Sequence, residues 1–504
     1  MNYIDDFLNK ITMYRLLLYV LLGIVMGAMA LSAVGRLQYN PLAIAFSAGY
    51  ITLICWLANK IFARVFQAPV ANESVFLTAL ILALIITPYH TRSDLMFMTA
   101  AAGLAIASKF ILAIRKKHIF NPAAVAVALT SAGAAQSASW WVGTSALLPF
   151  VIIGGLLIMR KVQRESMTLT FFAAVAASTI LLNIHSGHVG TALTRTILHS
   201  SLFFLGFIML TEPLTSPVTK NMRLWYAVLV GALFAPQIHI GHVYSTPELA
   251  LLAGNVFAYI VSPKYKLLPR LQAKLRLAPD IFDFIFTPNQ KLAYKPGQYM
   301  EWTLPHPGAD SRGNRRYLTL ASSPTEDSLR LGVKFYPKGS TYKKALLAMS
   351  SDTPIAAGQL GGDFVLPDDP ATKLVFIAGG IGITPFRSMV KYLLDTNQPR
   401  DVVLMYSEKT QAEFVYTDVF NQAAQQLGLK TVYTLTNTDT IPPDWRGSTG
   451  FVSAEMIRTQ VPDFSERVYY ISGSHALVSA VQDYLHSLGV ASSHIKTDFF
   501  PGYA

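Results

Sequence analysis

The chain has 504 residues, of which 52% are hydrophobic and 14% are charged, and its formal net charge is +12. This length excludes a single small domain, and this hydrophobicity excludes an ordinary soluble protein. The one cysteine, Cys55, lies in an apolar run, which excludes a disulfide framework, a cysteine zinc site and a cysteine-ligated iron–sulfur cluster. With cysteine ligands excluded, any electron carrier would be organic or haem, and we assign no metal-ligand residues.

Charge is distributed unevenly along the chain. Residues 1–262 hold 16 Lys and Arg and 7 Asp and Glu, whereas residues 263–504 hold 25 and 22. The second part has the charge content of a soluble protein and the first does not. We therefore predict an all-α polytopic membrane domain over 1–262, a basic linker over 263–278 and a soluble part over 279–504.

The first part contains ten apolar runs. They cover 16–34, 41–62, 74–89, 94–113, 121–138, 143–159, 168–184, 196–211, 223–238 and 246–262. A perpendicular membrane span needs about 20 apolar residues, so the shorter runs are expected to be tilted, broken or buried in protein. Asp5, Asp6 and the length of the first run argue against a cleavable signal, and we predict ten spans.

Basic clusters flank every second run, and with ten spans they all fall on one side of the membrane. The positive-inside rule then places both termini and the soluble part in the cytoplasm, and the protein in the inner (cytoplasmic) membrane. The excess positive charge reflects this topology and contact with lipid headgroups, and nucleic-acid binding is not expected.

Three polar stretches interrupt the membrane part: residues 118–124, residues 211–220 and Asn255. Broken helix ends with free N–H groups and a carboxylate would line a cofactor pocket, with Asn121, Thr215 and Thr219 as binding residues. The alternative is that Pro217, Lys220 and the hydroxyls only end helices.

These stretches, together with residues 73–88, 143–157 and 252–255, resemble the B subunit of the sodium-pumping NADH:quinone oxidoreductase and the D subunit of the Rnf-type electron-transport complex. The resemblance implies a flavin-carrying electron-transfer membrane domain. Those subunits esterify FMN to a threonine in a Ser-Gly-Ala-Thr type motif, whereas residues 131–134 read Ser-Ala-Gly-Ala here. We therefore expect no covalent flavin, and a non-covalent FMN or riboflavin and a quinone are the open alternatives.

The soluble part changes its pattern near residue 369. Short strands with frequent turn signals fill 279–368, which predicts a small antiparallel β-barrel. Strands alternate with helical segments over 369–504, which predicts an α/β domain with a parallel sheet.

Two segments of the predicted barrel have the residue types that bind phosphates. Arg316 on a predicted strand can hold a diphosphate while Thr319, three residues later, meets a ring nitrogen. Gly339 permits a tight turn, and Ser340 or Thr341 can cap a helix whose free amides attract phosphate. The alternatives are a plain strand and an ordinary helix cap.

A third segment lies in the α/β part. The apolar strand over 374–378 runs into a glycine-rich turn and then Pro385, which suits a first helical position. Glycines let the backbone approach a diphosphate while the helix dipole faces it.

In this order the three segments resemble the ferredoxin–NADP⁺ reductase superfamily over about 275–504, which implies an FAD barrel over 279–368 and an NAD(P)H domain over 369–504. In this resemblance Arg316 binds the FAD diphosphate, Thr319 faces the flavin N5, and Ser340 and Thr341 cover the phosphates. The residues expected at the cofactors are Arg316, Tyr317, Leu318, Thr319, Val333, Lys334, Gly339, Ser340, Thr341, Gly379, Gly380, Gly382, Thr384, Pro385, Ser472, Gly473, Phe499 and Phe500, with Thr319 and Ser472 as catalytic residues. Leu318 replaces the family's stacking aromatic residue, and Ser472 replaces its cysteine.

These features predict a membrane flavoprotein that passes electrons from cytosolic NADH or NADPH through FAD to a quinone, a second flavin or an acceptor across the membrane. Glu408 and Lys409 leave the choice between NADH and NADPH open. One alternative is a haem-containing transmembrane ferric or superoxide-forming reductase that uses His185 and His199. Another is redox-driven transport of sodium ions or protons.

Overall fold

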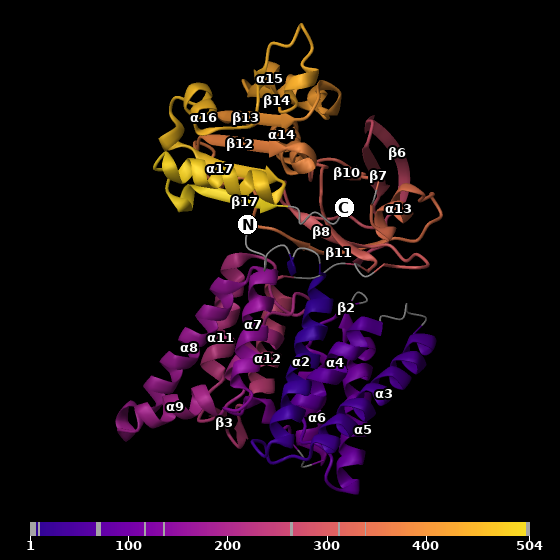
Figure 1. Ribbon diagram of the computed structural model, residues 1–504, viewed down its shortest axis with the longest axis vertical. Coiled ribbons are helices and arrows are strands. Elements are labelled where there is room, and N and C mark those ends of the chain that lie inside the picture. The colour runs from indigo at the N-terminus through magenta and orange to yellow at the C-terminus, as the bar shows by residue number, and fades with distance from the viewer. Residues whose placement is uncertain are drawn as a thin grey trace. The chain divides into compact units, whose positions relative to one another are not determined.

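The computed structural model describes residues 7–8, 11–66, 72–114, 117–134, 137–262, 266–310, 313–337 and 339–499. The chain divides into two compact units, Met1–Tyr265 and Lys266–Ala504 (Figure 1).

The first unit is helical. Its helices are α2 (Met13–Ala33), α3 (Pro41–Val65), α4 (Asn72–Ile85), α5 (Arg92–Ile111), α6 (Pro122–Ala134), α7 (Leu148–Val162), α8 (Glu165–Asn183), α9 (Val189–Leu198), α10 (Leu202–Phe204) with the π-helical η3 (Leu205–Met209), α11 (Lys220–Leu233) and α12 (Pro247–Val261). Each apolar run of the sequence overlaps a helix.

Not all of these helices are long enough to cross a membrane. Within the described residues, α2, α3, α5 and α8 are long and apolar enough to span, and α9 with α10 and η3 would give a fifth span bent by 58°. The remaining helices are shorter because proline or polar residues interrupt the apolar runs, as at Pro88, Asn121 and Pro247. Ten complete crossings therefore stay a prediction.

The packing of this unit repeats once. In the first set of helices α5 packs against α3 and α6, and in the second set α11 packs against α8 and α12. The two sets meet where α2 packs on α7 and α6 packs on α12. This arrangement brings the start of α6 and the middle of α12 together, and both places carry an asparagine.

The second unit begins with two antiparallel sheets. One contains β10 (Leu329–Lys334), β7 (Ile281–Thr287) and β6 (Arg270–Ala278), and the other contains β5 (Lys266–Leu267), β11 (Ala356–Gly361), β8 (Tyr299–Thr303) and β9 (Arg315–Thr319). They enclose a core that includes Phe284, Phe286 and Trp302, and the rings of Phe286 and Trp302 lie 4.9 Å apart. Helix α13 (Thr341–Leu347) adds Tyr342 and Leu346 to this core.

The prediction of a linker over 263–278 is wrong for residues 266–278. Residues 270–278 form β6, which pairs with β7 along its whole length and turns at Pro279 and Asp280. The basic side chains of Arg270, Lys274 and Arg276 lie on the exposed surface of this strand. An exposed, charged edge strand has the composition of a linker, which explains the misassignment.

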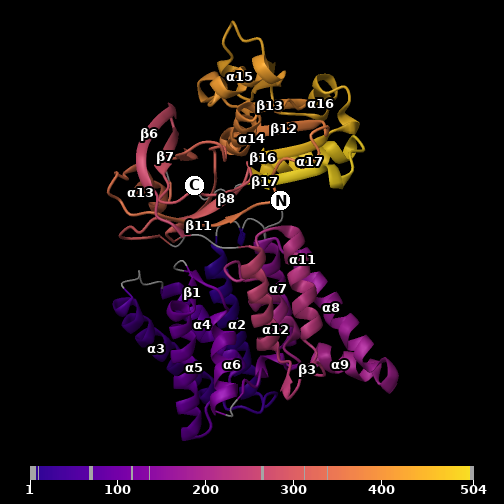
Figure 2. The same cartoon turned by 180° about the vertical axis from the view of Figure 1, so that it is seen from behind.

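The rest of the unit is a six-stranded parallel sheet. Its order is β15 (Ser448–Thr449), β14 (Lys430–Leu435), β13 (Val402–Glu408), β12 (Leu374–Gly379), β16 (Val468–Gly473) and β17 (Ile495–Phe499). Helices α14 (Thr384–Asp395) and α15 (Thr417–Leu427) pack on one face, and α16 (Ala454–Gln460) and α17 (His475–Ser487) pack on the other (Figures 1 and 2). The chain order reverses between β12 and β16, and ligands of such sheets bind at the carboxyl ends of strands at this switch point.

We expect a fragment that starts at Lys266 to fold alone, whereas one that starts at the sequence-predicted boundary, residue 279, should not. The shorter fragment lacks β6 and leaves one edge of β7 unpaired. Thermal unfolding followed by circular dichroism should show one cooperative transition for 266–504 and none for 279–504. Equal cooperativity of the two fragments would contradict this role for β6.

Candidate functional site

The glycine-rich turn lies at the switch point of the parallel sheet. β12 ends at Gly379, and η4 (Gly380–Ile383) leads directly into α14, whose first turn contains Pro385. Gly380 has φ +60°, and a Cβ on Gly382 would lie 2.4 Å from the carbonyl oxygen of Ser472. Glycine therefore permits the left-handed backbone at residue 380 and the close packing of residue 382 on β16, and the turn leads directly into the N-terminus of α14.

The end of β16 forms the other side of this turn. A Cβ on Gly473 would lie 3.1 Å from the carbonyl oxygen of Gly379, so the two strands leave room for backbone only. Ser472 is fully buried, and its Oγ has no hydrogen-bond partner within the described part of the chain. Thr384, the first residue of α14, is also buried, and its Oγ1 donates to the carbonyl oxygen of Ile381 at 3.1 Å. A buried hydroxyl without a partner costs free energy, which is the pattern of a site that a ligand completes.

The adjacent strand places a carboxyl next to Ser472. Asp498 on β17 is paired in register with Ser472, and burial raises the pKa of its carboxyl to about 6. The sequence prediction did not include Asp498 as a site residue, although it lies next to the predicted aromatic pair. The side chain of Phe499 and all of Phe500 lie outside the described residues, so their role stays a prediction.

β9 carries the segment predicted to face a flavin. It is the outermost strand of its sheet, with Arg316 and Thr319 buried and Tyr317 46% exposed. The Arg316 Nη1 donates to the carbonyl oxygens of Gly313 at 3.3 Å and Arg315 at 2.6 Å, and its guanidinium carbon lies 4.9 Å from the centre of the Tyr342 ring. Leu318 is half-buried against the barrel core.

The helix cap predicted after β10 is confirmed. Ser340 is the N-cap of α13, and its Oγ accepts a hydrogen bond from the Lys343 amide at 3.3 Å. Gly339 forms a turn with Tyr336, and the Thr341 Oγ1 accepts from the Asp310 amide at 3.0 Å.

Val333 and Lys334 have contacts within the chain, and their contact with a cofactor stays a prediction. Val333 lies in the barrel core, and the Lys334 ammonium forms an ion pair with Glu413 and lies 3.9 Å from the Glu408 Oε2. Their sequence pattern could not show this because Glu408 and Glu413 follow β10 by more than 70 residues.

Glu408 and Lys409 are placed differently. Glu408 is buried at the end of β13, where the Tyr406 hydroxyl donates to its Oε1 at 3.2 Å, and Lys409 is exposed. Burial raises the pKa of the Glu408 carboxyl to about 7, and Lys334 opposes the shift. The Glu408 Oε2 would lie 4.0 Å from a Cβ on Gly380, so a carboxyl group with a near-neutral pKa borders the glycine-rich turn.

The helical unit contains a buried polar cluster where α6 meets α12. The Asn121 amide donates to the Asn255 Oδ1 at 2.8 Å, and the Asn121 Nδ2 donates to the Glu212 Oε2 at 2.9 Å. The Thr215 Oγ1 also donates to the Glu212 Oε2, at 3.2 Å, and the Asn255 Nδ2 donates to the Thr215 carbonyl oxygen at 3.2 Å. The His118 Nε2 lies 3.8 Å from the Glu212 Oε1.

A pocket opens beside this cluster. It is lined by Ile114, His118, Ile119, Leu214, Thr215, Asn255, Ala258 and Tyr259. Of the three residues predicted to line a pocket, Thr215 is in the lining, Asn121 joins it through Glu212 but is not in the lining, and Thr219 is the N-cap of α11. Glu212 and Asn255 were not among the predicted binding residues, although an asparagine within an apolar run is the signal that could have identified Asn255.

The two histidines considered for haem do not lie on facing helices. His185 belongs to the short η2 (Ile184–Ser186), and His199 ends α9. Both side chains are exposed on the surface of the helical unit.

Two models of known protein families match the chain, one in each of its two compact units. Residues 141–265 match the NQR2, RnfD, RnfE family model, and residues 376–483 match the model of the oxidoreductase NAD-binding domain. The predicted resemblances of both halves are therefore confirmed, and together they indicate an electron-transfer oxidoreductase with a membrane unit.

Individual relatives match less than half of the chain. The chain is 27% identical over 226 residues to the glycine betaine monooxygenase reductase subunit of Pseudomonas aeruginosa, which covers 44% of this chain and 60% of that protein. It is 28% identical over 218 residues to a flavohemoprotein of Bacillus cereus, which covers 41% and 53%. The chain thus spans less than two thirds of each of these relatives.

Two solved structures are also similar. The cytochrome P450 reductase of Amycolatopsis has a TM-score of 0.43 at 23% identity and covers 48% of this chain and 72% of that chain. The FAD/NAD-binding domain of nitric oxide dioxygenase from Vibrio cholerae has a TM-score of 0.41 at 18% identity, covering 46% and 98%.

We expect Glu408→Gln to flatten the pH dependence of stability of the 266–504 fragment. A carboxyl whose native pKa is about 7, above its usual 4.5, stabilises the fold fully below about pH 4.5, and this contribution is lost as the pH rises to about 7. The contribution that is lost amounts to about 3 kcal/mol of the free energy of unfolding. Urea unfolding at pH 5 and pH 8 measures it, with the exposed Glu455→Gln as control. Parallel pH profiles for wild type and Glu408→Gln would show that Glu408 titrates normally.

Proposed function

We propose that this chain is a membrane-bound flavoprotein oxidoreductase that receives hydride from NADH or NADPH on FAD and delivers electrons to its helical unit. The observation that carries the proposal is the glycine turn at the β12–β16 switch point, within the NAD-binding match, where the left-handed Gly380 and the closely packed Gly382 lead into the N-terminus of α14. The names of the relatives, a monooxygenase reductase subunit and a flavohemoprotein, agree with reductase chemistry.

The residues present fit a bound dinucleotide and a flavin. A Cβ on Gly380 would meet nothing closer than the Glu408 carboxyl at 4.0 Å, so the turn has free space at this position, and the buried Ser472 hydroxyl has no hydrogen-bond partner within the described residues. FAD, when bound, accepts a hydride at a ring nitrogen and releases electrons singly. We assign Arg316 and the capped start of α13 to the FAD phosphates, Thr319 to the flavin ring edge, and Ser472 with Asp498 to the nicotinamide end.

In the helical unit we assign the cluster of Asn121, Glu212, Thr215 and Asn255 to a non-covalent flavin, FMN or riboflavin, or to a quinone. Amide and carboxylate groups in an apolar setting suit the polar edge of such a ring, and the adjoining pocket is lined mainly by apolar side chains. The terminal acceptor in this proposal is a quinone, a second flavin or an acceptor across the membrane. The second unit and both termini lie in the cytoplasm, as the loop charges predict.

We expect Arg316→Ala to lower the FAD content of the purified protein at least tenfold, because a buried cation that faces a diphosphate contributes several hydrogen bonds. The matched control is Arg315→Ala on the opposite face of β9, which removes a 3.8 Å contact with Glu301. Absorbance at the flavin band and mass spectrometry of extracted cofactors measure the content. Equal FAD loss in both variants, or in neither, would contradict the role of Arg316.

We expect the full chain in detergent to reduce ferricyanide with NADH or NADPH, and the 266–504 fragment to retain this activity. Only the full chain should reduce a quinone, because that step needs the helical unit in our proposal. Proteoliposomes with sodium-sensitive and pH-sensitive dyes separate this reaction from ion transport. A colourless protein that neither dinucleotide reduces would exclude the proposed function.

A further inference from the structure

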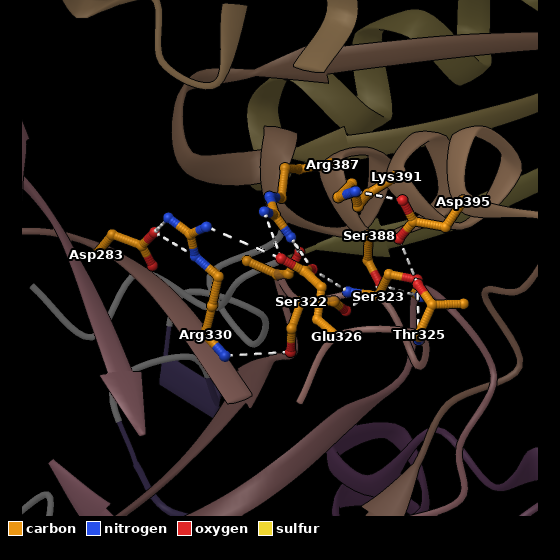
Figure 3. A network of polar contacts seen from close by, with 12 residues as sticks. Asp283, Ser322, Ser323, Thr325, Glu326, Arg330, Arg387, Ser388, Lys391 and Asp395 are labelled. Atoms are coloured by element: carbon orange, nitrogen blue, oxygen red, sulfur yellow. Dashed lines mark hydrogen bonds and ion pairs between the residues drawn. The ribbon is translucent and has the colours of Figure 1, made fainter. Parts of the chain in front are cut away.

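A network of buried polar groups joins α14 to the segment that follows β9. Figure 3 shows this network, and the residues that it labels come from β7, β10, α14 and the loop over 322–326. α14 begins at the glycine-rich turn, and β9 carries Thr319, so the network connects the two segments assigned above to the dinucleotide and the flavin.

Arg387 lies at the centre of this network and is 2% exposed. Its Nη1 donates to the Ala321 carbonyl oxygen at 2.9 Å, and its Nη2 donates to the Glu326 Oε1 at 2.9 Å. The Nη1 also pairs with the Glu326 Oε2, which makes the ion pair bidentate. The Ser323 amide donates to the same Oε2 at 2.7 Å and fixes the carboxylate. A bidentate pair with these extra bonds restricts the orientation of the Arg387 guanidinium.

Ser388 makes a second connection one residue later. Its Oγ donates to the Ser322 carbonyl oxygen at 2.6 Å. The Tyr294 hydroxyl donates to the same carbonyl at 3.0 Å, and the Arg330 amide donates to the Ser322 Oγ at 3.1 Å. The segment after β9 is therefore held from α14 and from the barrel strands at once.

A steric contact limits how closely the barrel strand β10 can approach the start of α14. A Cβ on Gly332 of β10 would lie 2.7 Å from the Thr384 Cγ2 and 2.7 Å from the Tyr416 hydroxyl. The barrel thus touches the first residue of α14, and the network prevents the two parts from separating.

The network lies close in sequence to both segments that are assigned to the cofactors. Ala321 lies two residues after Thr319, and Arg387 lies five residues after Gly382. A hydrogen bond between Arg387 and Ala321 therefore limits the gap between the flavin strand and the dinucleotide turn. Hydride transfer requires reacting atoms about 3–3.5 Å apart, and a misplacement of about 1 Å costs about 100-fold in rate.

We propose that Arg387, held by Glu326 and assisted by Ser388, is a positioning residue for hydride transfer. This inference rests on the proposed function. In the step, the C4–H bond of the dihydronicotinamide breaks with its electron pair and an N–H bond forms at the flavin, so the nicotinamide is oxidised and the flavin is reduced. Arg387 touches neither ring and acts through the backbone of Ala321.

The test is anaerobic stopped-flow reduction of the full-length holoprotein by NADH and by NADPH. Arg387→Gln should keep its FAD and bind the better dinucleotide within about threefold of wild type, while the maximal rate of flavin reduction falls about 10- to 100-fold. The charge-transfer absorbance of the nicotinamide–flavin complex should weaken in parallel. Arg387→Lys should recover only part of the rate, because a lysine cannot form the bidentate pair.

The matched control is Arg467→Gln. Arg467 is also buried and bidentate, with Asp401 at 2.8 and 3.0 Å and Asp463 at 2.7 Å, but it lies at the opposite end of the same parallel sheet. This variant should lose stability and keep the wild-type reduction rate and charge-transfer band. Should Arg387→Gln lose its FAD, Ser388→Ala, which deletes one hydroxyl, should still lower the reduction rate about 3- to 10-fold.

A wild-type rate and band in folded Arg387→Gln would overturn the proposal, as would equal rate losses in Arg387→Gln and Arg467→Gln. A wild-type protein that binds FAD but is reduced by neither dinucleotide would reject the proposed function, and this inference with it.

Discussion

The connection between the two sheet systems of the second unit depends on an ion pair that is buried from solvent. Arg387 and Glu326 connect a helix of the parallel sheet to a loop of the antiparallel sheets, and Arg387 is almost fully buried. Removing charges from water costs several kcal/mol per ion, and the attraction between them offsets this cost only when the geometry is good and the remaining hydrogen bonds are made. Here the Ala321 carbonyl and the Ser323 amide supply two of those bonds, while the buried Arg387 Nε has no hydrogen-bond partner within the described residues. Apolar side chains of similar volume could join the same elements at less cost, so the directional geometry of the pair is what distinguishes it.

The polar groups of the helical unit also form hydrogen bonds with one another where they are buried. Asn121, Glu212, Thr215 and Asn255 satisfy one another across three segments that are distant in sequence. In an apolar environment each unmade hydrogen bond is expensive, so such a cluster fixes how the ends of short helices meet. Short helices are what make the cluster possible, because helices that spanned the whole unit would leave no backbone ends near Asn255.

Differences between the expected and observed structures have particular causes. β6 resembled a linker because its exposed face is basic, and only its pairing with β7 identifies it as a strand. Lys334 was expected at a cofactor because it precedes the predicted helix cap, and the structure adds its ion pair with Glu413. The runs counted as ten spans include segments of 13 to 15 residues, since composition registers apolar character and not where a helix ends.

The sequence alone determined the division into an apolar and a soluble part, the strand–turn–helix at 374–395, the cap at Ser340 and the resemblance of each half to its family. These properties depend on residues within one turn or one strand of each other, or on the average composition of a long segment. The tertiary structure alone decided that Asp498 lies beside Ser472, that Asn255 meets Asn121, and that Arg387 holds the segment after Thr319. These partners are separated by 26, 134 and 66 residues, and only the packing of sheets and helices brings such positions together.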